Sequence, residues 1–429
     1  MTVRQPRPGR RSLLEHRWED ALNRDLNRDE SDANSAQDRL IEAVFARWES
    51  HGRSGMSARQ ISQAAGISVS SIYHHFGSLE RLLQSSQRAC LAEAQSWCDR
   101  QIEQVDGLAG SPESFSGFFA HIVDDWVHTC RPLAFAQREC GMLASRSAEF
   151  GEQEEQWRVL WTQFWERAGS VFALGSGATV VERVFDGESL FHMLPWRRAV
   201  DRACLEETAH GLTAWLTGRS VPAAPWREFA RAQAVASMPE TPSWDEKTWQ
   251  IVEAAADLIA ITGAASVTHR SVAEQAGVSL GTVSHKFRTK SALLEAAFEA
   301  IYARVITRPA EPGRTAPPAD PAAFAGNFAQ AVLRDKPTDA TDDLVIAAAR
   351  DPALSNLGAQ LRYLRGRTAR AALQSLFGDR RAVSVLEGAL FSSYLSAQIR
   401  RYAGGGRAVA HGVVESELEV FGRVIGLRP

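Results

Sequence analysis

Cysteine is scarce in this chain and is not arranged for zinc or disulfide chemistry. The five cysteines lie at positions 90, 98, 130, 140 and 204 of 429 residues. None forms a C-x-x-C pair, and none stands with histidines at the spacing of a zinc site. We therefore expect no metal site and reduced structural thiols, with a redox sensor as the alternative.

Long hydrophobic runs are also absent. No stretch of 18 or more apolar residues occurs, and the N-terminal residues contain no apolar signal core. The sequence therefore predicts no membrane span, no membrane partner and a cytoplasmic location.

The short motifs of catalytic sites are missing as well. The sequence contains no G-x-S-x-G, no P-loop, no H-E-x-x-H and no glycine-rich dinucleotide loop. His121 and His128 lie seven residues apart on one predicted helix, which is more typical of core or surface positions than of metal ligands. We predict that the protein is not an enzyme and uses no cofactor.

Residues 57–83, SARQISQAAGISVSSIYHHFGSLERLL, have the pattern of two short helices joined by a tight turn. Ile61 and Ala65 share one face of the first helix, and Gly66 can take the left-handed conformation that ends it. Ser68 is a good N-cap for the second helix, which Ile72 and Phe76 anchor. This arrangement predicts a helix-turn-helix whose second helix enters a DNA major groove.

The same pattern occurs a second time, at residues 271–294, SVAEQAGVSLGTVSHKFRTKSALL. Gly66 corresponds to Gly277 and Phe76 to Phe287, each at an offset of 211 positions (277 − 66 = 211). A repeat at this distance is no short-period solenoid, and it indicates duplication of a whole protein within one chain.

Both copies resemble the TetR (tetracycline-repressor type) family of transcriptional regulators. The residues that carry the resemblance are Ala64-Ala65-Gly66-Ile67-Ser68, Ile72-Tyr73-His74-His75-Phe76 and Leu82-Leu83 in the first copy, and Ala276-Gly277-Val278-Ser279, Gly281-Thr282-Val283, His285, Phe287, Lys290 and Leu293-Leu294 in the second. The motif covers about a quarter of the chain, and the rest is similar to the family only in its helical pattern.

The resemblance implies an all-α fold of two tandem units, each with a helix-turn-helix domain and a helical ligand or dimerisation domain. The expected segments are a basic arm at 1–35, a first DNA-binding domain at 36–83, a first effector domain at 84–217, a linker at 218–245, a second DNA-binding domain at 246–294 and a second effector domain at 295–429. Within the first effector domain, the apolar spacing predicts helices at about 113–129, 131–146, 149–171, 178–193 and 197–217.

The resemblance to the family implies DNA contacts at matching positions of the two copies. They are Ser57, Arg59, Val69, Ser70, Ser71, Tyr73 and His74 in the first, and Thr268, Arg270, Leu280, Gly281, Thr282, Ser284, His285 and Lys290 in the second. Hydroxyl, imidazole and guanidinium groups can donate to phosphates or base edges. The expected partner is double-stranded operator DNA.

The two copies depart from the family pattern at different places. The usual lysine is present as Lys290 but is Leu79 in the first copy, and the usual tyrosine is Tyr73 but Ser284 in the second. We expect two unlike half-sites, with the Arg4–Arg11 segment helping the first copy as an arm rather than forming a plain solvated tail. The alternative is that one copy no longer binds DNA specifically.

Charge of one sign is not in large excess, but it is distributed unevenly. The chain has 48 basic and 51 acidic residues, a net charge of −3. Residues 39–83 hold five basic and three acidic side chains, and residues 250–294 hold four and three. Mildly basic segments in an acidic whole fit specific, salt-sensitive DNA contact better than general polyanion binding.

Tryptophan is abundant in the first half and absent after position 249. Most of the aromatics at 113–171 are expected in the core, but so many could also line an apolar pocket. The candidates for binding a small hydrophobic or aromatic effector are Phe119, Trp126, Trp157, Trp161 and Trp165.

Val184-Phe185-Asp186-Gly187 and Val385-Leu386-Glu387-Gly388 align at an offset of 201, on the penultimate helix of each unit. In the family, the last two helices usually form a four-helix dimer interface. Gly187 and Gly388 are therefore expected where two such helices approach closely.

One chain thus carries both DNA-binding domains that the family normally brings together by dimerisation. The sequence favours a ligand-responsive repressor that acts as a monomeric pseudo-dimer. The alternatives are a helical ligand- or protein-binding module with degenerate helix-turn-helix units, and an activator of the same family.

Overall fold

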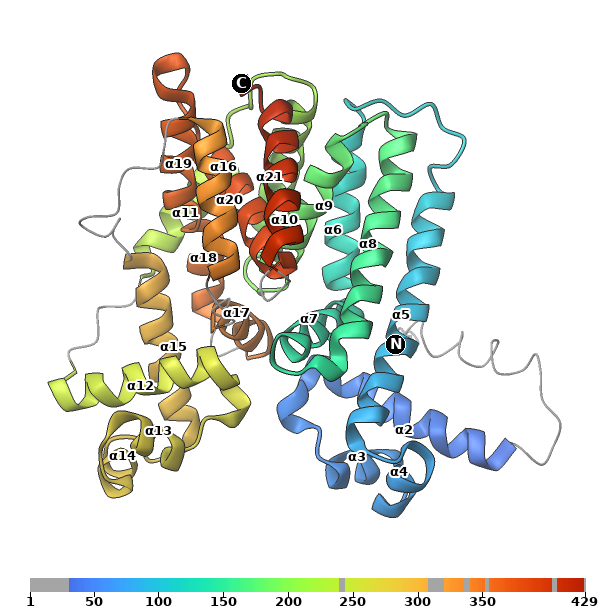
Figure 1. Cartoon of the computed structure of the whole chain (residues 1–429), viewed down its shortest axis with the longest axis vertical. Helices are drawn as coiled ribbons and strands as arrows, with labels where there is room; N and C mark the ends of the chain where they lie inside the picture. The colour runs from blue at the N-terminus through green and yellow to red at the C-terminus, as the bar shows by residue number, and fades with distance from the viewer. Residues whose placement is uncertain are drawn as a thin grey trace, which may run out of the picture.

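The computed structural model describes residues 31–238, 244–307, 320–334, 340–351, 355–402 and 407–427, and the regular elements in these ranges are all helices (Figure 1). The Arg4–Arg11 arm and the first 30 residues lie outside the described ranges. No helix in the described part of the chain is long and apolar enough to cross a lipid bilayer.

The first unit begins with α2 and ends with α10. Its elements are α2 (Ser31–Ser50), η1 (Arg53–Gly55), α3 (Ala58–Ala65), α4 (Val69–Phe76), α5 (Leu79–Glu103), α6 (Phe115–His128), α7 (Arg131–Arg146), η2 (Ala148–Phe150), α8 (Gly151–Val171), α9 (Gly177–His192) and α10 (Arg198–Leu216). The five helices predicted between 113 and 217 are confirmed, with ends that agree within two residues.

The second unit follows α11 (Pro225–Ala236), which lies within the predicted linker, and it has two helices, α18 and α19, where the first unit has α8. Its elements are α12 (Glu246–Thr262), η3 (Ala264–Ser266), α13 (His269–Ala276), α14 (Leu280–Lys286), α15 (Lys290–Thr307), α16 (Pro321–Arg334), α17 (Ala340–Arg350), α18 (Ser355–Tyr363), α19 (Arg367–Phe377), η5 (Gly378–Arg380), α20 (Val385–Tyr402) and α21 (Arg407–Val424).

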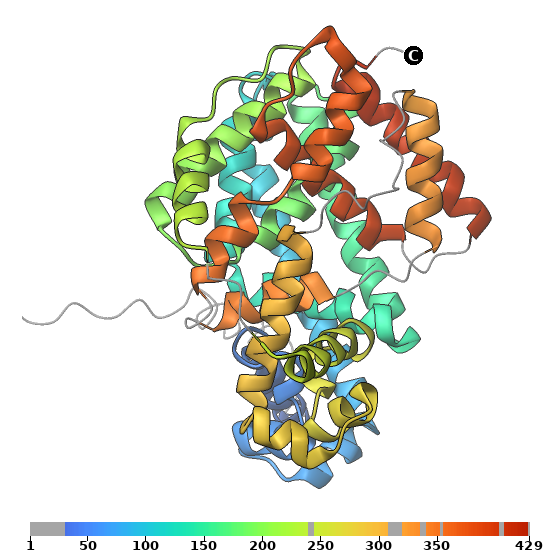
Figure 2. The ribbon, with the colours of Figure 1, turned by 90° about the vertical axis from the view of Figure 1, so that its left-hand side faces the viewer.

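The two helix-turn-helix domains lie at the same end of the molecule. Figures 1 and 2 show α2–α4 and α12–α14 together below a body of longer helices, and α7 and α17 lie between this body and the two domains. We call α2–α4 the first head and α12–α14 the second head. Helices α5 and α15 run from the heads into the body, and α2 and α12 also pack against α7 and α17.

Helices α9 and α20 pack against each other and join the two units, with α10 and α21 beside them. The predicted close approach at Gly187 is confirmed, because a Cβ at this position would lie 2.5–2.6 Å from the backbone and side chain of Ser393 in α20. The prediction for Gly388 is wrong. A Cβ there would meet Gly366 and Arg370 of the same unit, so Gly388 lets α19 approach α20 instead.

Charged side chains fill much of the junction between the units. Arg183 of α9 forms two hydrogen bonds to the Glu417 carboxylate of α21, at 2.8 and 3.1 Å. Glu188, fully buried in α9, pairs with Arg365 at 2.6 Å and accepts a hydrogen bond from Ser393. Burial alone would raise the pKa of Glu188, but Arg365 and His192 hold it far below its usual value. Replacing one member of such a buried ion pair is strongly destabilising, because the other member remains as an unpaired buried charge.

Candidate DNA-binding surface and ligand pocket

The first head owes its shape to local capping. The Ser57 hydroxyl accepts from the Gln60 backbone, and the Gln60 side chain accepts from the Ser57 backbone, which completes a capping box at the start of α3. Gly66 ends α3 in the left-handed conformation, with φ at 64°. Ser68 then caps α4 by accepting from the Ser71 backbone.

The second head repeats these features at the corresponding positions. Thr268 and Ser271 form the capping box of α13, and Gly277 ends this helix with φ at 63°. Ser279 caps α14 by accepting from the Thr282 backbone. The sequence-based assignment of both turns is therefore confirmed down to their caps.

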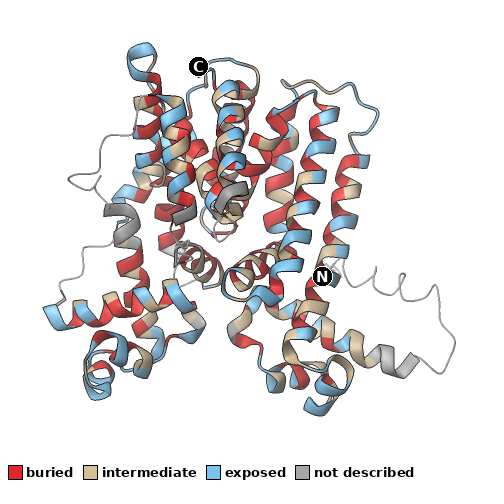
Figure 3. Ribbon diagram, in the orientation of Figure 1, coloured by how far each residue is buried: buried red, intermediate tan, exposed pale blue. Residues whose placement is uncertain are grey.

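The predicted DNA-contacting residues lie on the outward side of the two heads. Thirteen of the fifteen are exposed, and Ser71 and Thr282 are half-buried. Figure 3 shows α4 and α14 largely exposed at the far end from the body. Tyr73 of α4 and Leu280 of α14 are among the most exposed large side chains of the two heads, with 52% and 50% of their surface open to solvent.

Some of these residues form side-chain hydrogen bonds within their own head. The hydroxyls of Ser71 and Thr282 bond those of Ser68 and Ser279, at 2.9 and 2.8 Å, so they stabilise the start of α4 and α14. For six other predicted residues, no hydrogen bond to the side chain is found within the described part of the chain. This group comprises Arg59, Tyr73 and His74 in the first head and Arg270, Ser284 and His285 in the second.

The two heads differ at the start of the helix that follows the recognition helix. Leu79 is half-buried and packs against the core, whereas Lys290 is exposed. Partial burial lowers the pKa of Lys290 from its usual value. Only the second head therefore has a cationic side chain at this point.

Sequence analysis missed Lys286 at the end of α14. It forms an ion pair with Asp245, the N-cap of α12, and this pair lowers the pKa of Asp245 to about 2. The corresponding residue of the first head is His75, at the offset of 211, so nothing in the repeat alignment indicated the contact.

Some contacts between body and heads cross from one unit to the other. Arg350, the last residue of α17 in the second unit, donates to the carbonyls of Trp48 and Glu49 at the end of α2. It also pairs with Glu139 of α7. At the corresponding place in the first unit, Arg146 ends α7, pairs with Asp343 of α17 and lies against Gly263 at the end of α12.

The five aromatic residues predicted for an effector site lie in two environments. Phe119, Trp126 and Trp165 are almost completely buried. Trp126 packs on Trp97 at 5.2 Å between ring centroids, and Phe119 packs on Trp165 at 5.8 Å. Trp157 and Trp161 are also almost completely buried, and they form part of the wall of a cavity.

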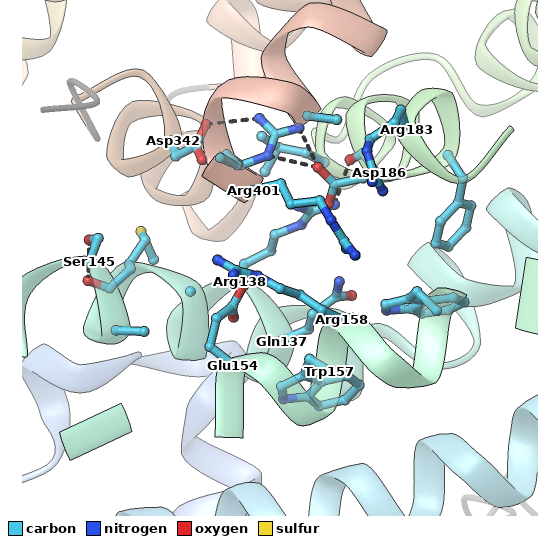
Figure 4. Close-up of a pocket in the computed structure, with 18 of the residues that line it drawn as sticks. Gln137, Arg138, Ser145, Glu154, Trp157, Arg158, Arg183, Asp186, Asp342 and Arg401 are labelled. Atoms are coloured by element: carbon cyan, nitrogen blue, oxygen red, sulfur yellow. Dashed lines mark hydrogen bonds and ion pairs between the residues drawn. The ribbon is translucent and has the colours of Figure 1, made fainter. Parts of the chain in front are cut away.

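This cavity has a volume of about 250 Å³ and lies between α7, α8 and α9 of the first unit and α17 and α20 of the second (Figure 4). Its walls are more polar than the apolar lining we expected. The charged residues that line it are Arg138, Arg158, Arg183, Arg400, Arg401, Glu154, Glu182, Asp186 and Asp342. Burial raises the pKa of Glu154 to about 7, although Arg158 opposes this shift.

Two exposed recognition helices on capped helix-turn-helix domains define a DNA-binding regulator. The family model for bacterial regulatory proteins of the tetR family matches residues 40–85 and 251–297, which cover most of the first and second heads. The chain therefore contains two tandem copies of the DNA-binding domain of the tetR family.

Named relatives match about a third of the chain or less. The HTH-type transcriptional repressor KstR2 of Mycobacterium tuberculosis is 28% identical over 139 residues, which are 32% of this chain and 68% of the relative. KstR2 of Mycolicibacterium smegmatis is 27% identical over 111 residues, 26% of this chain and 52% of the relative. A relative of which 139 residues are 68% has about 200 residues, less than half of the 429 here.

Proposed function

We propose that this tetR-family regulator is a repressor that binds one operator as a single chain, with its first and second heads on two half-sites of the same duplex. The observation that carries the proposal is that both heads, each with an exposed recognition helix, lie at the same end of one body (Figures 1 and 2). A tether of this kind gives the second head a high effective concentration once the first has bound.

The junction between α9 and α20 supports this arrangement. In the family, the corresponding helices of two subunits form the dimer interface, and here both belong to one chain. The Gly187–Ser393 approach and the Arg365–Glu188 pair use the surfaces that a second chain would otherwise need. We therefore infer that the protein is a monomer in solution.

We also propose that the regulator responds to a small molecule bound in the cavity. Helices α7 and α17 both line this cavity, and their last residues, Arg146 and Arg350, contact the head of the opposite unit. A ligand that moves these helices apart changes the spacing of the two heads. It thereby shifts the population between states that fit the operator and states that do not.

DNA binding by each head can be tested separately. Duplexes from the protein's own promoter region serve as probes in gel-shift titrations at several salt concentrations. The double variants Arg59→Ala/Tyr73→Ala and Arg270→Ala/His285→Ala each remove exposed groups from one head.

If both heads bind the same duplex, each double variant weakens binding at least about tenfold, which corresponds to about 1.4 kcal/mol. If one double variant binds the operator as tightly as the unaltered protein does, the head that carries it does not contribute to binding. Failure of the unaltered protein to bind any promoter duplex at low salt would contradict the proposal as a whole.

A further inference from the structure

The cavity is built from both units, so it exists only while the two halves of the chain are joined. Arg158 of α8 and Trp161 come from the first unit, and Asp342, Ile346 and Arg401 come from the second. A molecule bound here would contact the two units at once. The affinity for such a molecule therefore depends on the relative position of the two units.

Three of the five arginines in the wall are committed to carboxylates of the protein. Arg138 and Arg400 both pair with Asp186, at 2.6 and 2.7 Å. Arg183 pairs with Glu417 at 2.8 Å and also with Glu182 at 2.7 Å. The pairs of Arg400 with Asp186 and of Arg183 with Glu417 join the two units, and all three arginines are engaged by carboxylates of the protein.

Arg158 and Arg401 are the most exposed of the five arginines, and they reach the cavity from opposite units (Figure 4). Arg158 lies 3.2 Å from Glu154, a carboxyl group whose pKa burial raises to about 7, and 3.5 Å from the exposed Glu155. Arg401 lies 3.2 Å from Glu182, which already pairs with Arg183 at the shorter distance. Their side chains are 30% and 24% exposed, so both guanidinium groups retain open donors.

Trp161 contributes its ring to the wall, while its indole nitrogen is buried and, among the described residues, no hydrogen-bond partner accepts from it. The remaining wall includes apolar side chains on both sides, namely Met142, Trp157, Phe185, Leu190 and Ile346.

We propose that the cavity binds a small organic carboxylate with an apolar body, whose carboxylate is shared between Arg158 of the first unit and Arg401 of the second. The proposal deepens the effector site and rests on the proposed function only for the consequence that binding alters DNA affinity. Planar guanidinium groups suit carboxylates because each can donate two parallel hydrogen bonds. The aromatic and aliphatic walls bury the apolar body.

The carboxylate class can be tested with matched pairs of probes that differ in charge and little in shape. We would titrate the full chain with 2-naphthoate and 2-naphthamide, and with decanoate and decanamide, by isothermal titration calorimetry. The carboxylates are expected to bind at least about tenfold more tightly than their amides. Equal affinity within a pair, or no binding of either carboxylate up to millimolar concentration, would overturn the proposal.

Variants at the two arginines identify the site. Arg158→Gln and Arg401→Gln should each reduce the preference for carboxylate over amide toward one, and lysine at either position should restore part of it. Arg167→Gln is the matched control on α8, because Arg167 pairs with Asp99 outside the cavity. A preference that survives both glutamine changes would contradict the site. The ratio of two affinities does not depend on a general loss of stability.

Gel shifts with promoter DNA separate this proposal from the proposed function. If the unaltered protein binds DNA but not the carboxylates, the ligand class is wrong and the regulator stands. If carboxylates bind with the expected preference but promoter DNA does not, the DNA-binding function is wrong and the ligand site stands.

Discussion

Arg350 donates a hydrogen bond of 2.8 Å to the backbone carbonyl of Trp48, although the two residues are 302 positions apart in the chain. Trp48 lies in the last turn of α2, where helix carbonyls have no partner within the helix. Arg350 therefore stabilises the end of a helix in the head of the other unit. It also lies 4.9 Å from the ring centroid of Phe135 in α7, so one side chain joins the body of both units to the first head.

We expect Arg350→Ala to lower the free energy of unfolding by about 3 kcal/mol, because Glu139 and two backbone carbonyls lose a charged partner in a poorly solvated place. Thermal unfolding followed by circular dichroism measures the change. Arg167→Ala is the control, since its exposed pair with Asp99 contributes less than about 1 kcal/mol. Equal effects of the two substitutions would contradict a clamping role for Arg350.

A second prediction compares the same substitution at two helical glycines. Gly117 of α6 has no neighbouring atom within 4 Å of a Cβ, whereas Gly187 lies against Ser393. Gly117→Ala should stabilise the protein by about 0.5–1 kcal/mol, because alanine favours the helix. Gly187→Ala should destabilise it by about 2 kcal/mol, because α9 and α20 must move apart. Urea unfolding would measure both, and stabilisation by Gly187→Ala would show that the two helices do not pack so closely.

The unlike residues Leu79 and Lys290 predict opposite effects on salt dependence. Leu79→Lys should add about one phosphate contact, which steepens the slope of log affinity against log salt by about 0.9, and Lys290→Leu should make the slope shallower by a similar amount. Because Leu79 packs against the core, its replacement should also cost about 1 kcal/mol of stability. Gel shifts at four salt concentrations give the slopes. Unchanged slopes in both variants would show that neither position lies near a phosphate.

Glu154 predicts a specific pH dependence of stability. Its pKa is about 7 in the folded chain and near 4.5 in the unfolded chain, so the folded state binds more protons between these values. Stability contributed by this group is therefore present below about pH 4.5 and is lost as the pH rises through 7. The groups that face it are Arg138 of α7, Arg158 of α8, Asp186 of α9 and Arg400 of α20.

Glutamine at position 154 removes this titration. The difference in melting temperature between Glu154→Gln and the unaltered protein should be more positive at pH 8 than at pH 5. A difference that stays constant over this range would show that Glu154 is ionised throughout.

The local structure was predictable because it is encoded by neighbouring residues. Ser57, Gly66 and Ser68 specify caps and a turn through their own backbone and side-chain chemistry, so both heads could be assigned from the sequence. The helix at 131–146 was likewise predicted with its observed ends, since its apolar face recurs at helical spacing.

The contacts between units could not be predicted in this way. Gly388 occupies the position that corresponds to Gly187, yet it packs within its own unit, because only the folded chain determines which face α20 presents to α9. The pair of Glu154 and Arg158, four residues apart, has the same pattern as a solvated pair on a helix surface. Its place in a cavity wall depends on Arg401, which lies more than 240 positions away in the sequence.

Sedimentation velocity with and without a promoter duplex tests the central claim most directly. A single chain that carries both heads should sediment as a 47.1 kDa monomer and form a complex of one chain with one duplex. A stable dimer in solution, or a complex that needs two chains for each duplex, would contradict the account. Either result would mean that a single chain is not the unit that binds the operator.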